Sequence, residues 1–542
     1  MVRAALSFTP DTYHAGQAAL GRRVANTAFL RAAVAGRGGG EVVGYGYEAG
    51  HAGAFAEAVR AIDPAAPARW LLTTDAEELA AQGAVHRMDP AIQAEVAARA
   101  WVGLGRYSIT AVAHTVFNRL PELALLAREP LMPWDALVCT SHSLRAAVAA
   151  VLEAELEYAR WRYGTEAAPS LPQLPVIPLG VHCEDHLRPD AARAAARSAL
   201  AVGEDEVAAL FVGRLSLMSK AHPGQMYQGL EVAAARTGRR LVLIECGWPK
   251  TDNDRLAFER GGALLAPGVR RLRVDGNDPL SRADAWNAAD LFISLSDNIQ
   301  ETFGLTPLEA MAAGLPVVAS DWDGYRDTVR DGVDGFLIPT WAPAPGLGAH
   351  LAYAHQARTI TDDTLSWGAA AATSVDPERL VRALSELVVS EELRRRMGAA
   401  GQARARAEFD WARVYGRYVE LWGELDARRR RDGAGLQAVR PGAQLDPFTA
   451  FAAYPTHAFG PQTRVALRPG ATLAAYRALA DHPLFPSGAA AQATAAPLWG
   501  LLEGGATTLE AAAAALGRPV RSVALAAGVL AKMGFLAFEP DA

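Results

Sequence analysis

At 542 residues, the chain is too long for a single hydrophobic core, and we expect two to four domains. Apolar residues make up 51% and charged residues 21%, which excludes an intrinsically disordered chain. The formal net charge of -6 gives no overall attraction to nucleic acid or to an anionic membrane.

The cysteines and the apolar runs favour a cytoplasmic protein. Cys139, Cys183 and Cys246 lie far apart in the sequence, so we expect neither a disulfide framework nor a zinc site. No apolar run reaches the 18 residues of a membrane span, and the stretch 4–6 is too short for a signal peptide. Composition leaves open a surface patch that makes the protein peripheral to a membrane.

The first 185 residues alternate short apolar runs with segments of helical length. Helical segments include residues 20–35 and 92–104. The runs that indicate buried strands are residues 4–8, 41–45, 69–72, 108–113, 136–139 and 174–177. Strands that alternate with helices predict a parallel sheet covered on both faces. Residues 1–185 are therefore expected to form one doubly wound α/β domain of Rossmann-like type.

The same alternation restarts and predicts a second Rossmann-like domain over residues 186–427. Its expected strands are residues 207–212, 241–246, 269–274, 291–294 and 316–319. Ligands of such folds bind outside the carboxyl ends of the strands, so we expect a site in the cleft between the two domains. Residues 340–373 indicate an inserted loop. Helix follows from residue 377 to about 427, and the last helix can cross back to the first domain.

A linker is expected over residues 428–445, because it begins with the basic run 428–431 followed by Asp432 and Gly433. A small, mainly α-helical domain is expected over residues 446–542. Within it, Thr507 and Glu510 have the spacing of a helix capping box. A helix over 519–533 and a strand over 535–538 follow.

The order of elements in this last domain resembles winged-helix modules, including small peptide-binding chaperone domains of that shape. The resemblance implies a protein or peptide partner. The basic residues that can be placed on its second helix are few, namely Arg518, Arg521 and Lys532. So few phosphate contacts argue against nucleic acid as a partner.

Residues 300–338 carry the strongest chemical signal. Thr306 suits a helix N-cap, Pro307 suits the first helical position, and Gly314 with Pro316 ends the helix. A short helix over about 307–313 is therefore predicted. Its N-terminus, with partial positive charge and unpaired N–H groups, forms a site for an anion.

Two carboxylates, Glu301 and Glu309, flank this anion site, and Gly304 lets a ligand approach the backbone closely. Carboxylates accept hydrogen bonds from hydroxyl groups, so a sugar joined to phosphate fits the pattern. Structural roles stay open: Glu309 could complete a capping box with Thr306, and Glu301 could be a solvated loop residue.

The segment as a whole resembles the Glu-x7-Glu signature of family 4 glycosyltransferases. The match includes Glu301, the run 303–305, Glu309 and the run 310–318. Members of this family are retaining enzymes of the GT-B fold, in which two Rossmann-like domains face a cleft. The resemblance covers about residues 1–425 and implies metal-independent transfer of a sugar, hexosyltransferase-like, from a nucleotide diphosphate sugar to an acceptor hydroxyl, without a cofactor.

The resemblance also implies roles for individual residues. Arg214 and Lys220 match the basic pair that holds the donor diphosphate, Glu301 contacts the donor sugar, Glu309 binds the ribose, and His114 lies near the reacting sugar. Two cations and a helix N-terminus neutralise the leaving diphosphate, so no metal site is expected. Structural roles stay open for Lys220 and His114. The expected donor-binding residues are Gly213, Phe303, Gly304, Leu305, Thr306 and Glu309.

The sequence departs from the family pattern in four places. Gly16 and Gly21 are separated where the family carries adjacent glycines, Asp327 stands where a glutamate is common, and residues 340–373 and those after 446 fall outside the pattern. Gly180 is expected at the hinge between the two domains. The acceptor, whether a glycan, lipid, small molecule or protein, has no signature in the sequence.

Two other functions stay open. Sugar phosphorylases and nucleotide-sugar epimerases share the GT-B fold, and phosphate dependence or epimerisation without an acceptor would identify them. In a different class of function, the C-terminal domain could make the chain a protein- or peptide-binding regulator.

Overall fold

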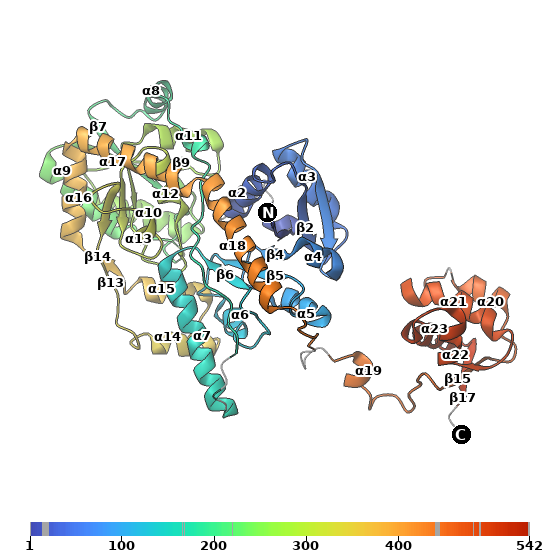
Figure 1. The fold of residues 1–542 in the computed structure, drawn as a ribbon. Coiled ribbons are helices and arrows are strands. Elements are labelled where there is room, and N and C mark those ends of the chain that lie inside the picture. Colours follow the sequence, from blue (N-terminus) through green and yellow to red (C-terminus); the bar gives the residue numbers. More distant parts are fainter. Residues whose placement is uncertain are drawn as a thin grey trace. The chain divides into compact units, whose positions relative to one another are not determined.

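The computed structural model describes residues 2–13, 21–164, 166, 169–218, 220–439, 445–480, 482–486 and 489–539. Gly16, residues 440–444 of the expected linker and residues 540–542 of the expected last domain lie outside the described residues. The chain divides into two compact units, residues 1–441 and 442–542, which are described separately. The larger unit contains two six-stranded sheets with helices on both faces, as expected for a doubly wound α/β protein (Figure 1).

The first sheet has the strand order β3-β2-β1-β4-β5-β6, and its strands pair in parallel. The strands are β1 (Ala5–Ser7), β2 (Val42–Gly46), β3 (Ala68–Leu72), β4 (Ala84–Arg87), β5 (Ser108–Ala113) and β6 (Ala136–Cys139). The helices that join or flank them are α1 (Pro10–Tyr13), α2 (Gly21–Ala35), α3 (His51–Ile62), α4 (Ala76–Gln82), α5 (Gln93–Val102), α6 (Leu120–Leu125) and α7 (His142–Tyr163). Because the strand order reverses between β1 and β4, a crevice is expected at their carboxyl ends.

The expected strand over 174–177 is wrong. Residues 173 and 176 form only isolated bridges with β6, because Pro172, Pro175 and Pro178 interrupt the segment and lack backbone N–H donors. Strand β4 was not expected, because its apolar run stops after two residues at His86 and Arg87.

The second sheet has the order β12-β11-β10-β7-β8-β9, and its strands also pair in parallel. Its strands are β7 (Glu206–Val212), β8 (Arg240–Gly247), β9 (Arg270–Asp275), β10 (Leu291–Ser294), β11 (Val317–Ser320) and β12 (Gly335–Ile338). Its helices are α8 (Asp190–Ala199), α9 (Gly224–Thr237), α10 (Asp252–Leu265), α11 (Pro279–Ala288), α12 (Leu305–Ala312), α13 (Tyr325–Thr328), α16 (Pro377–Val389) and α17 (Glu391–Arg404). Strand β10 is buried throughout, which explains its uninterrupted apolar sequence.

The segment expected to be an inserted loop, 340–373, contains regular structure. Strand β13 (Thr340–Trp341) pairs antiparallel with β14 (Ser374–Val375), and helices α14 (Ala349–Gln356) and α15 (Asp362–Ala370) lie between them. Thr361 caps α15, since its side chain accepts a hydrogen bond from the N–H of Thr364. The expectation failed because the Pro- and Gly-rich part ends before α14 begins.

The last helix of the larger unit, α18 (Trp411–Asp432), packs against α2 and β5 of the first domain. Trp422 Nε1 donates a hydrogen bond to Thr110 Oγ1 of β5 at 3.1 Å. The helix continues to residue 432, so the arginine run forms its last turn rather than the start of a linker. Within that turn, Arg430 Nε lies 2.7 Å from Asp426 Oδ2.

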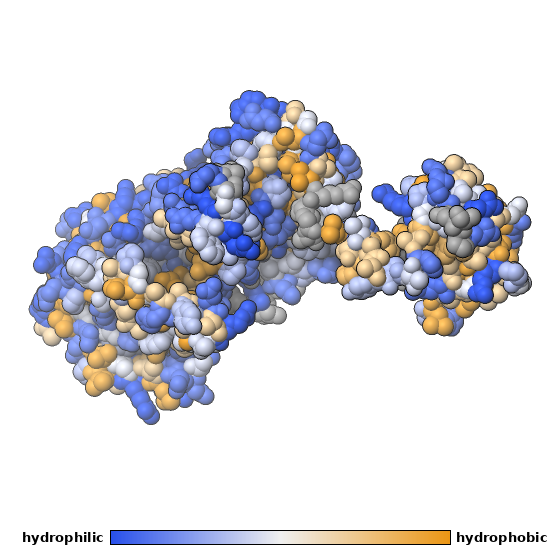
Figure 2. Space-filling view, turned by 90° about the horizontal axis from the view of Figure 1, so that it is seen from below, coloured by the Kyte–Doolittle hydropathy of each residue, from blue (hydrophilic) through white to orange (hydrophobic). Residues whose placement is uncertain are grey.

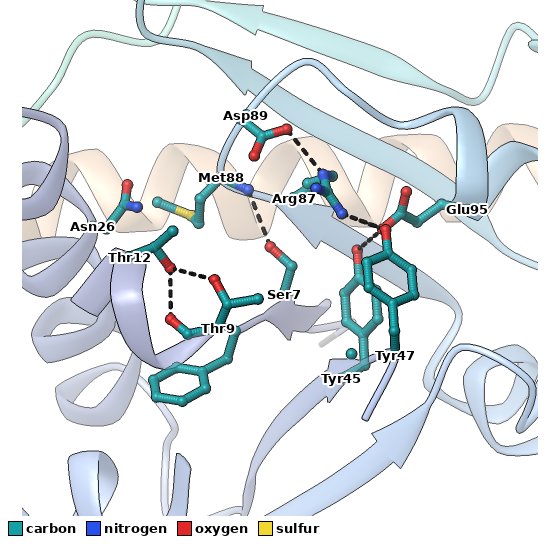
Figure 3. A pocket seen from close by; sticks show the side chains of 12 residues that line it. Ser7, Thr9, Thr12, Asn26, Tyr45, Tyr47, Arg87, Met88, Asp89 and Glu95 are labelled. Carbon is teal, nitrogen blue, oxygen red and sulfur yellow. Dashed lines mark hydrogen bonds and ion pairs between the residues drawn. The ribbon is translucent and has the colours of Figure 1, made fainter. Parts of the chain in front are cut away.

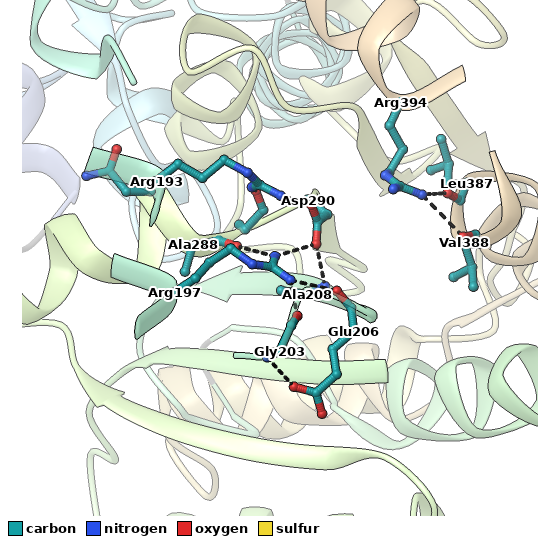
Figure 4. Close-up of polar contacts among 12 residues, drawn as sticks. Arg193, Arg197, Gly203, Glu206, Ala208, Ala288, Asp290, Leu387, Val388 and Arg394 are labelled. Atoms are coloured by element: carbon teal, nitrogen blue, oxygen red, sulfur yellow. Dashed lines mark hydrogen bonds and ion pairs between the residues drawn. The ribbon is translucent and has the colours of Figure 1, made fainter. Parts of the chain in front are cut away.

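A group of ion pairs holds α8 against the second sheet (Figure 4). Asp290, just before β10, lies 2.6 Å from Arg193, 3.0 Å from Arg197 and 2.8 Å from the N–H of Ala208. Burial alone would raise the pKa of Asp290, but the two guanidinium groups and the N–H group lower it below its ordinary value. Its side chain is only 8% exposed.

We expect Asp290→Ala to lower the free energy of unfolding by about 3 kcal/mol, because it leaves the 12%-exposed Arg197 guanidinium without its carboxylate. Urea denaturation followed by circular dichroism measures the effect. The control is Asp252→Ala, whose 92%-exposed side chain pairs with Arg255 and should cost less than about 1 kcal/mol. Equal losses in the two variants would contradict the structural role of Asp290.

The smaller unit has its own core and a three-stranded antiparallel sheet of order β16-β15-β17. Its elements are α19 (Pro447–Ala450), β15 (Arg464–Leu467), α20 (Leu473–Ala480), α21 (Ala489–Leu502), β16 (Thr507–Thr508), α22 (Leu509–Leu516), α23 (Val520–Lys532) and β17 (Leu536–Glu539). Its mainly helical character agrees with the expectation, whereas the winged-helix assignment stays a prediction. The N-cap of α22 is Thr508 rather than Thr507, because the Thr508 side chain accepts a hydrogen bond from the N–H of Ala511. Glu510 is therefore the second residue of the helix, and the expected capping box of Thr507 with Glu510 is wrong.

The surface of the larger unit is mostly hydrophilic on the face seen in Figure 2, with apolar residues in small groups. Within the described ranges, no single helix is long and apolar enough to cross a membrane. Helices α22 and α23 reach that length and composition only together, and they are bent by 115° at their junction. Their inward residues Leu509, Val523 and Leu530 are buried in the core of the smaller unit.

Candidate functional site

A cleft with a volume of about 1180 Å³ lies between the two sheets of the larger unit. Its lining comes from both domains and includes His114 after β5 and Arg214 after β7. All the residues predicted to form a site line it: His114, Gly213, Arg214, Lys220, Glu301, Phe303, Gly304, Leu305, Thr306 and Glu309. The cleft is large enough for a nucleotide sugar together with a second substrate.

The two predicted phosphate-binding cations lie on the loop that follows β7. Leu215 donates its N–H to the carbonyl of Trp248 at 2.9 Å, which fixes the start of this loop against the end of β8. Arg214 is partly buried, and desolvation lowers its pKa below the ordinary value, while the carboxylates of Asp363 and Glu301 act in the opposite direction. Lys220 Nζ lies 3.0 Å from Glu301 Oε2.

The helix that carries Glu309 begins two residues earlier than expected. Helix α12 starts at Leu305, and Gly304 is its N-cap with φ of 82°. A side chain on Gly304 is excluded, since a Cβ there would lie 1.9 Å from the ring of Tyr325. The N–H groups of Leu305 and Thr306, in the first turn of the helix, have no partner within it, and both residues line the cleft.

The predicted N-cap at Thr306 is therefore wrong, and so is its capping box with Glu309. Thr306 lies in the first turn, and Glu309 is the fifth residue of the helix instead of the third. The left-handed conformation of Gly304 turns the chain into the helix before Thr306 is reached. This placement removes the capping explanation for Glu309 and leaves its carboxylate on the wall of the cleft.

Ser141, at the start of α7, joins the two domains beside Glu301. Its hydroxyl lies 3.0 Å from the carbonyl oxygen of Thr302 and 2.9 Å from Asp323 Oδ1, and it accepts the N–H of Leu144 at 3.0 Å. Thr302 in turn donates to the carbonyl oxygen of His114. These contacts hold the loop that carries Glu301 against the first domain.

Asp327, one of the departures from the family pattern, contributes to the same junction. It accepts the backbone N–H of His142 at 2.7 Å, and its other oxygen lies 3.1 Å from His142 Nδ1. A carboxylate at the N-terminus of α7 also interacts favourably with the helix dipole.

If Asp323 is protonated, the Ser141 hydroxyl can form all of its hydrogen bonds with the one hydrogen that it has. The Ser141 hydroxyl has a single hydrogen but two neighbouring acceptors, the carbonyl oxygen of Thr302 and Asp323 Oδ1. A protonated Asp323 can donate to Ser141, which then donates to Thr302. Consistently, burial raises the pKa of Asp323 to about 7, and the nearby carboxylates of Glu301 and Asp327 act in the same direction.

This raised pKa predicts a pH-dependent stability. The folded state holds a proton on Asp323 between the ordinary pKa of 3.8 and about 7, whereas the unfolded state has lost it. The stabilisation is therefore fully present below pH 4 and is lost as the pH rises through 7, by at most about 1.4 kcal/mol per pH unit. Asp323→Asn should flatten this slope in urea denaturation between pH 5 and 8.

The matched control for that measurement is Asp321→Asn, which removes a carboxylate from the same loop. It should keep the wild-type slope. Asp297, whose pKa burial also raises to about 7, leaves a residual slope in both variants. A wild-type slope in Asp323→Asn would show that this carboxyl group is ionised in the folded protein.

The segment 340–373 reaches the cleft, which the sequence did not indicate. Asp363 of α15 lines the cleft and lies 2.7 Å from Lys250 Nζ, so a further cation stands near Arg214. Ser366 donates to Asn298 Oδ1 at 2.6 Å, which anchors α15 to the loop that carries Glu301. Among the described residues, no cluster of three His, Cys, Asp or Glu side chains could hold a metal ion. Metal independence stays a prediction.

Comparison with known proteins finds a family model that matches part of the second domain. Residues 193–344 match the family model of glycosyl transferases group 1. The chain is similar to D-inositol 3-phosphate glycosyltransferases of Thermobispora bispora (30% identical over 248 residues, 44% of this chain and 48% of the relative) and Xylanimonas cellulosilytica (32% over 270 residues, 46% and 60%). The chain thus spans about half the length of these curated relatives.

Solved structures share the fold of the larger unit. The chain is similar to Anabaena HepE in complex with UDP, with a TM-score of 0.50, 15% identity and coverage of 78% of this chain and 100% of that one. It is also similar to a glycosyltransferase from Rickettsia africae, with a TM-score of 0.50, 14% identity and coverage of 78% and 98%. The two facing parallel sheets are a GT-B fold, as expected from the sequence.

Proposed function

We propose that the chain moves a sugar from a nucleotide diphosphate sugar to an acceptor hydroxyl with retention of configuration, because residues 193–344 match the family model of glycosyl transferases group 1. The observation that carries the proposal is the meeting of Arg214, Lys220, Glu301 and the start of α12 in one cleft. Cations and unpaired N–H groups suit the diphosphate, and a neighbouring carboxylate suits the sugar hydroxyls.

The proposed mechanism is electrostatic and positional. Arg214, Lys220 and the N–H groups at the start of α12 stabilise the diphosphate as its bond to the anomeric carbon breaks, without a metal ion. The acceptor hydroxyl, held in the first domain, attacks the same face of an oxocarbenium-like sugar. Glu301 binds the sugar, with Lys220 at 3.0 Å fixing its carboxylate.

The remaining predicted residues bind the two ends of the donor, its ribose and its sugar. Glu309 binds the ribose hydroxyls, a role supported by the loss of its capping role, while Gly213, Phe303 and Leu305 approach the donor through the backbone. His114 contacts the reacting sugar from the first domain. The donor is a co-substrate, and no cofactor is required.

The test is nucleotide release by the purified chain against a panel of nucleotide sugars, in EDTA and without added metal. Slow release of one nucleoside diphosphate, accelerated by the correct acceptor, is expected. No release together with no thermal stabilisation by any nucleotide sugar would overturn the proposal. Release that depends on phosphate would instead identify a phosphorylase, and epimerisation of the donor without an acceptor would identify an epimerase.

We also propose that the smaller unit binds a protein or peptide rather than nucleic acid, in a cytoplasmic protein that can be peripheral to a membrane. Arg518, one of the few basic residues of its helix pair, lies 3.0 Å from Thr494 Oγ1 and is thus used within the unit. Binding of labelled duplex DNA at low salt would contradict this proposal.

A further inference from the structure

A second, smaller cavity lies in the first domain at the carboxyl ends of β1, β2 and β4, where the strand order reverses (Figure 3). Its polar lining includes Ser7, Thr12, Asn26, Tyr47 and Asp89. Thr12 and Asp89 line the large cleft as well, so the cavity adjoins the cleft on the side opposite the donor residues. With a volume of about 40 Å³, the cavity takes one end of a molecule, whose remainder can extend into the cleft toward the reacting sugar.

Two buried side chains of this cavity have unpaired acceptor atoms. Asn26 and Glu95 are each only 1% exposed, and Asn26 Oδ1 and Glu95 Oε2 have no hydrogen-bond partner among the described residues. An unpaired buried polar group costs about 1–3 kcal/mol. The two side chains stand on opposite sides of the cavity, Asn26 beside Thr12 and Glu95 beside Tyr47 (Figure 3). A ligand with hydroxyl or amino donors on both sides would satisfy them.

The only cation that lines this cavity, among the described residues, is already paired. Arg87 lies 2.9 Å from Asp89 Oδ1, 2.9 Å from Glu95 Oε1 and 2.6 Å from the hydroxyl of Tyr47. Burial and the carboxylate of Glu95 raise the pKa of Tyr47 to about 12, so its phenol is neutral. One guanidinium and two carboxylates leave the cavity with a surplus of negative charge.

This surplus decides between classes of ligand. A phosphate would meet the second oxygen of a buried carboxylate with no cation left to neutralise it, which is unfavourable in a desolvated site. A hydroxyl or an ammonium group donates hydrogen bonds to the same oxygen. Carboxylate, amide and hydroxyl groups on the walls together match a molecule with several hydroxyls.

We propose that this cavity binds one end of the acceptor and selects an uncharged or positively charged polyhydroxyl group over a phosphorylated one. The proposal rests on the proposed function. In the transfer, the acceptor oxygen bonds to the anomeric carbon, the bond from that carbon to the diphosphate oxygen breaks with its electron pair, and the hydroxyl proton passes to the departing diphosphate.

The test is ligand-observed NMR of the full chain with myo-inositol, glucosamine and D-inositol 3-phosphate. The first and third probes differ only in the phosphate. At least one of the first two should bind at least about tenfold more tightly than the phosphorylated probe. Asn26→Leu should weaken that binding at least about tenfold. Glu95→Gln should reduce the difference in affinity between the unphosphorylated probe and D-inositol 3-phosphate. The control is Glu77→Gln, whose side chain is 86% exposed on α4.

Equal or tighter binding of D-inositol 3-phosphate would overturn the proposal, and so would unchanged binding in Asn26→Leu. Failure of every probe in a panel widened to cyclitols, hexoses and amino sugars would overturn it as well. Because binding is measured without a donor, its outcome is separate from nucleotide release. Polyol binding without nucleotide release would refute the proposed function alone, and nucleotide release without polyol binding would refute the acceptor assignment alone.

Discussion

Glu301→Ala is expected to abolish sugar transfer, with a loss of about 1000-fold or more in kcat, while the fold stays intact. Glu301 is 16% exposed and lines the cleft beside Lys220, at the point where the sugar of a bound donor would meet the acceptor. Removing one preorganised electrostatic group from such a site costs about 100- to 1000-fold, and here Lys220 loses its partner as well. The measurement is the rate of product formation with the donor identified by nucleotide release.

The controls separate chemistry from folding. Glu301→Gln keeps the size of the side chain and should also be inactive, because a neutral amide cannot stabilise positive charge on the sugar. Glu391→Ala removes a 74%-exposed carboxylate from the same domain and should retain wild-type activity. Substantial activity in Glu301→Ala, with an unchanged circular dichroism spectrum, would place the essential carboxylate elsewhere.

Arg214→Ala is expected to lower kcat/KM by about 100- to 1000-fold and to weaken binding of the product nucleoside diphosphate. Arg214 is a partly buried cation at the start of the loop that is fixed to β8, so its charge is less screened than that of a surface arginine. Arg214→Lys should recover only part of the loss, because an ammonium cannot make two parallel hydrogen bonds to a phosphate. Calorimetric titration with the nucleoside diphosphate measures the binding effect.

The matched control is Arg395→Ala on α17, whose side chain is 74% exposed and pairs only loosely with Glu391 at 3.7 Å. It should change neither binding nor turnover. If Arg214→Ala bound the nucleoside diphosphate as tightly as the wild type, Lys220 and Lys250 would be the main phosphate ligands.

The strands that were predicted best are those buried on both faces. The bounds of β5, β6 and β10 agree with the expected runs, because strands covered on both faces are apolar throughout. Strand β4 was not predicted, because its His86 is polar although it is fully buried. Thr110 Oγ1, 3.0 Å from His86 Nδ1, provides the missing partner, and burial lowers the pKa of His86 to about 3, so the ring is neutral.

The site residues that could be predicted are those that lie close together in the sequence. Glu301, Gly304 and Glu309 belong to one short segment with a recognisable spacing, and the structure places all three on one cleft. The contact of Ser141 with Asp323 joins residues 182 positions apart, and no local pattern encodes it. The approach of Asp363 to Lys250 depends likewise on how α15 folds back across the second domain.

The return of α18 to the first domain has a consequence for synthesis at the ribosome. Tyr418 and Trp422 of this helix complete the aromatic cluster around Phe29 and His86, with ring centroids 5.0 to 6.0 Å apart. The nascent first domain therefore leaves the exit tunnel with that apolar face uncovered. Translation of the residues from β6 to the end of α18 takes roughly 15 to 60 s. The domain made first is thus completed only after the second has been synthesised.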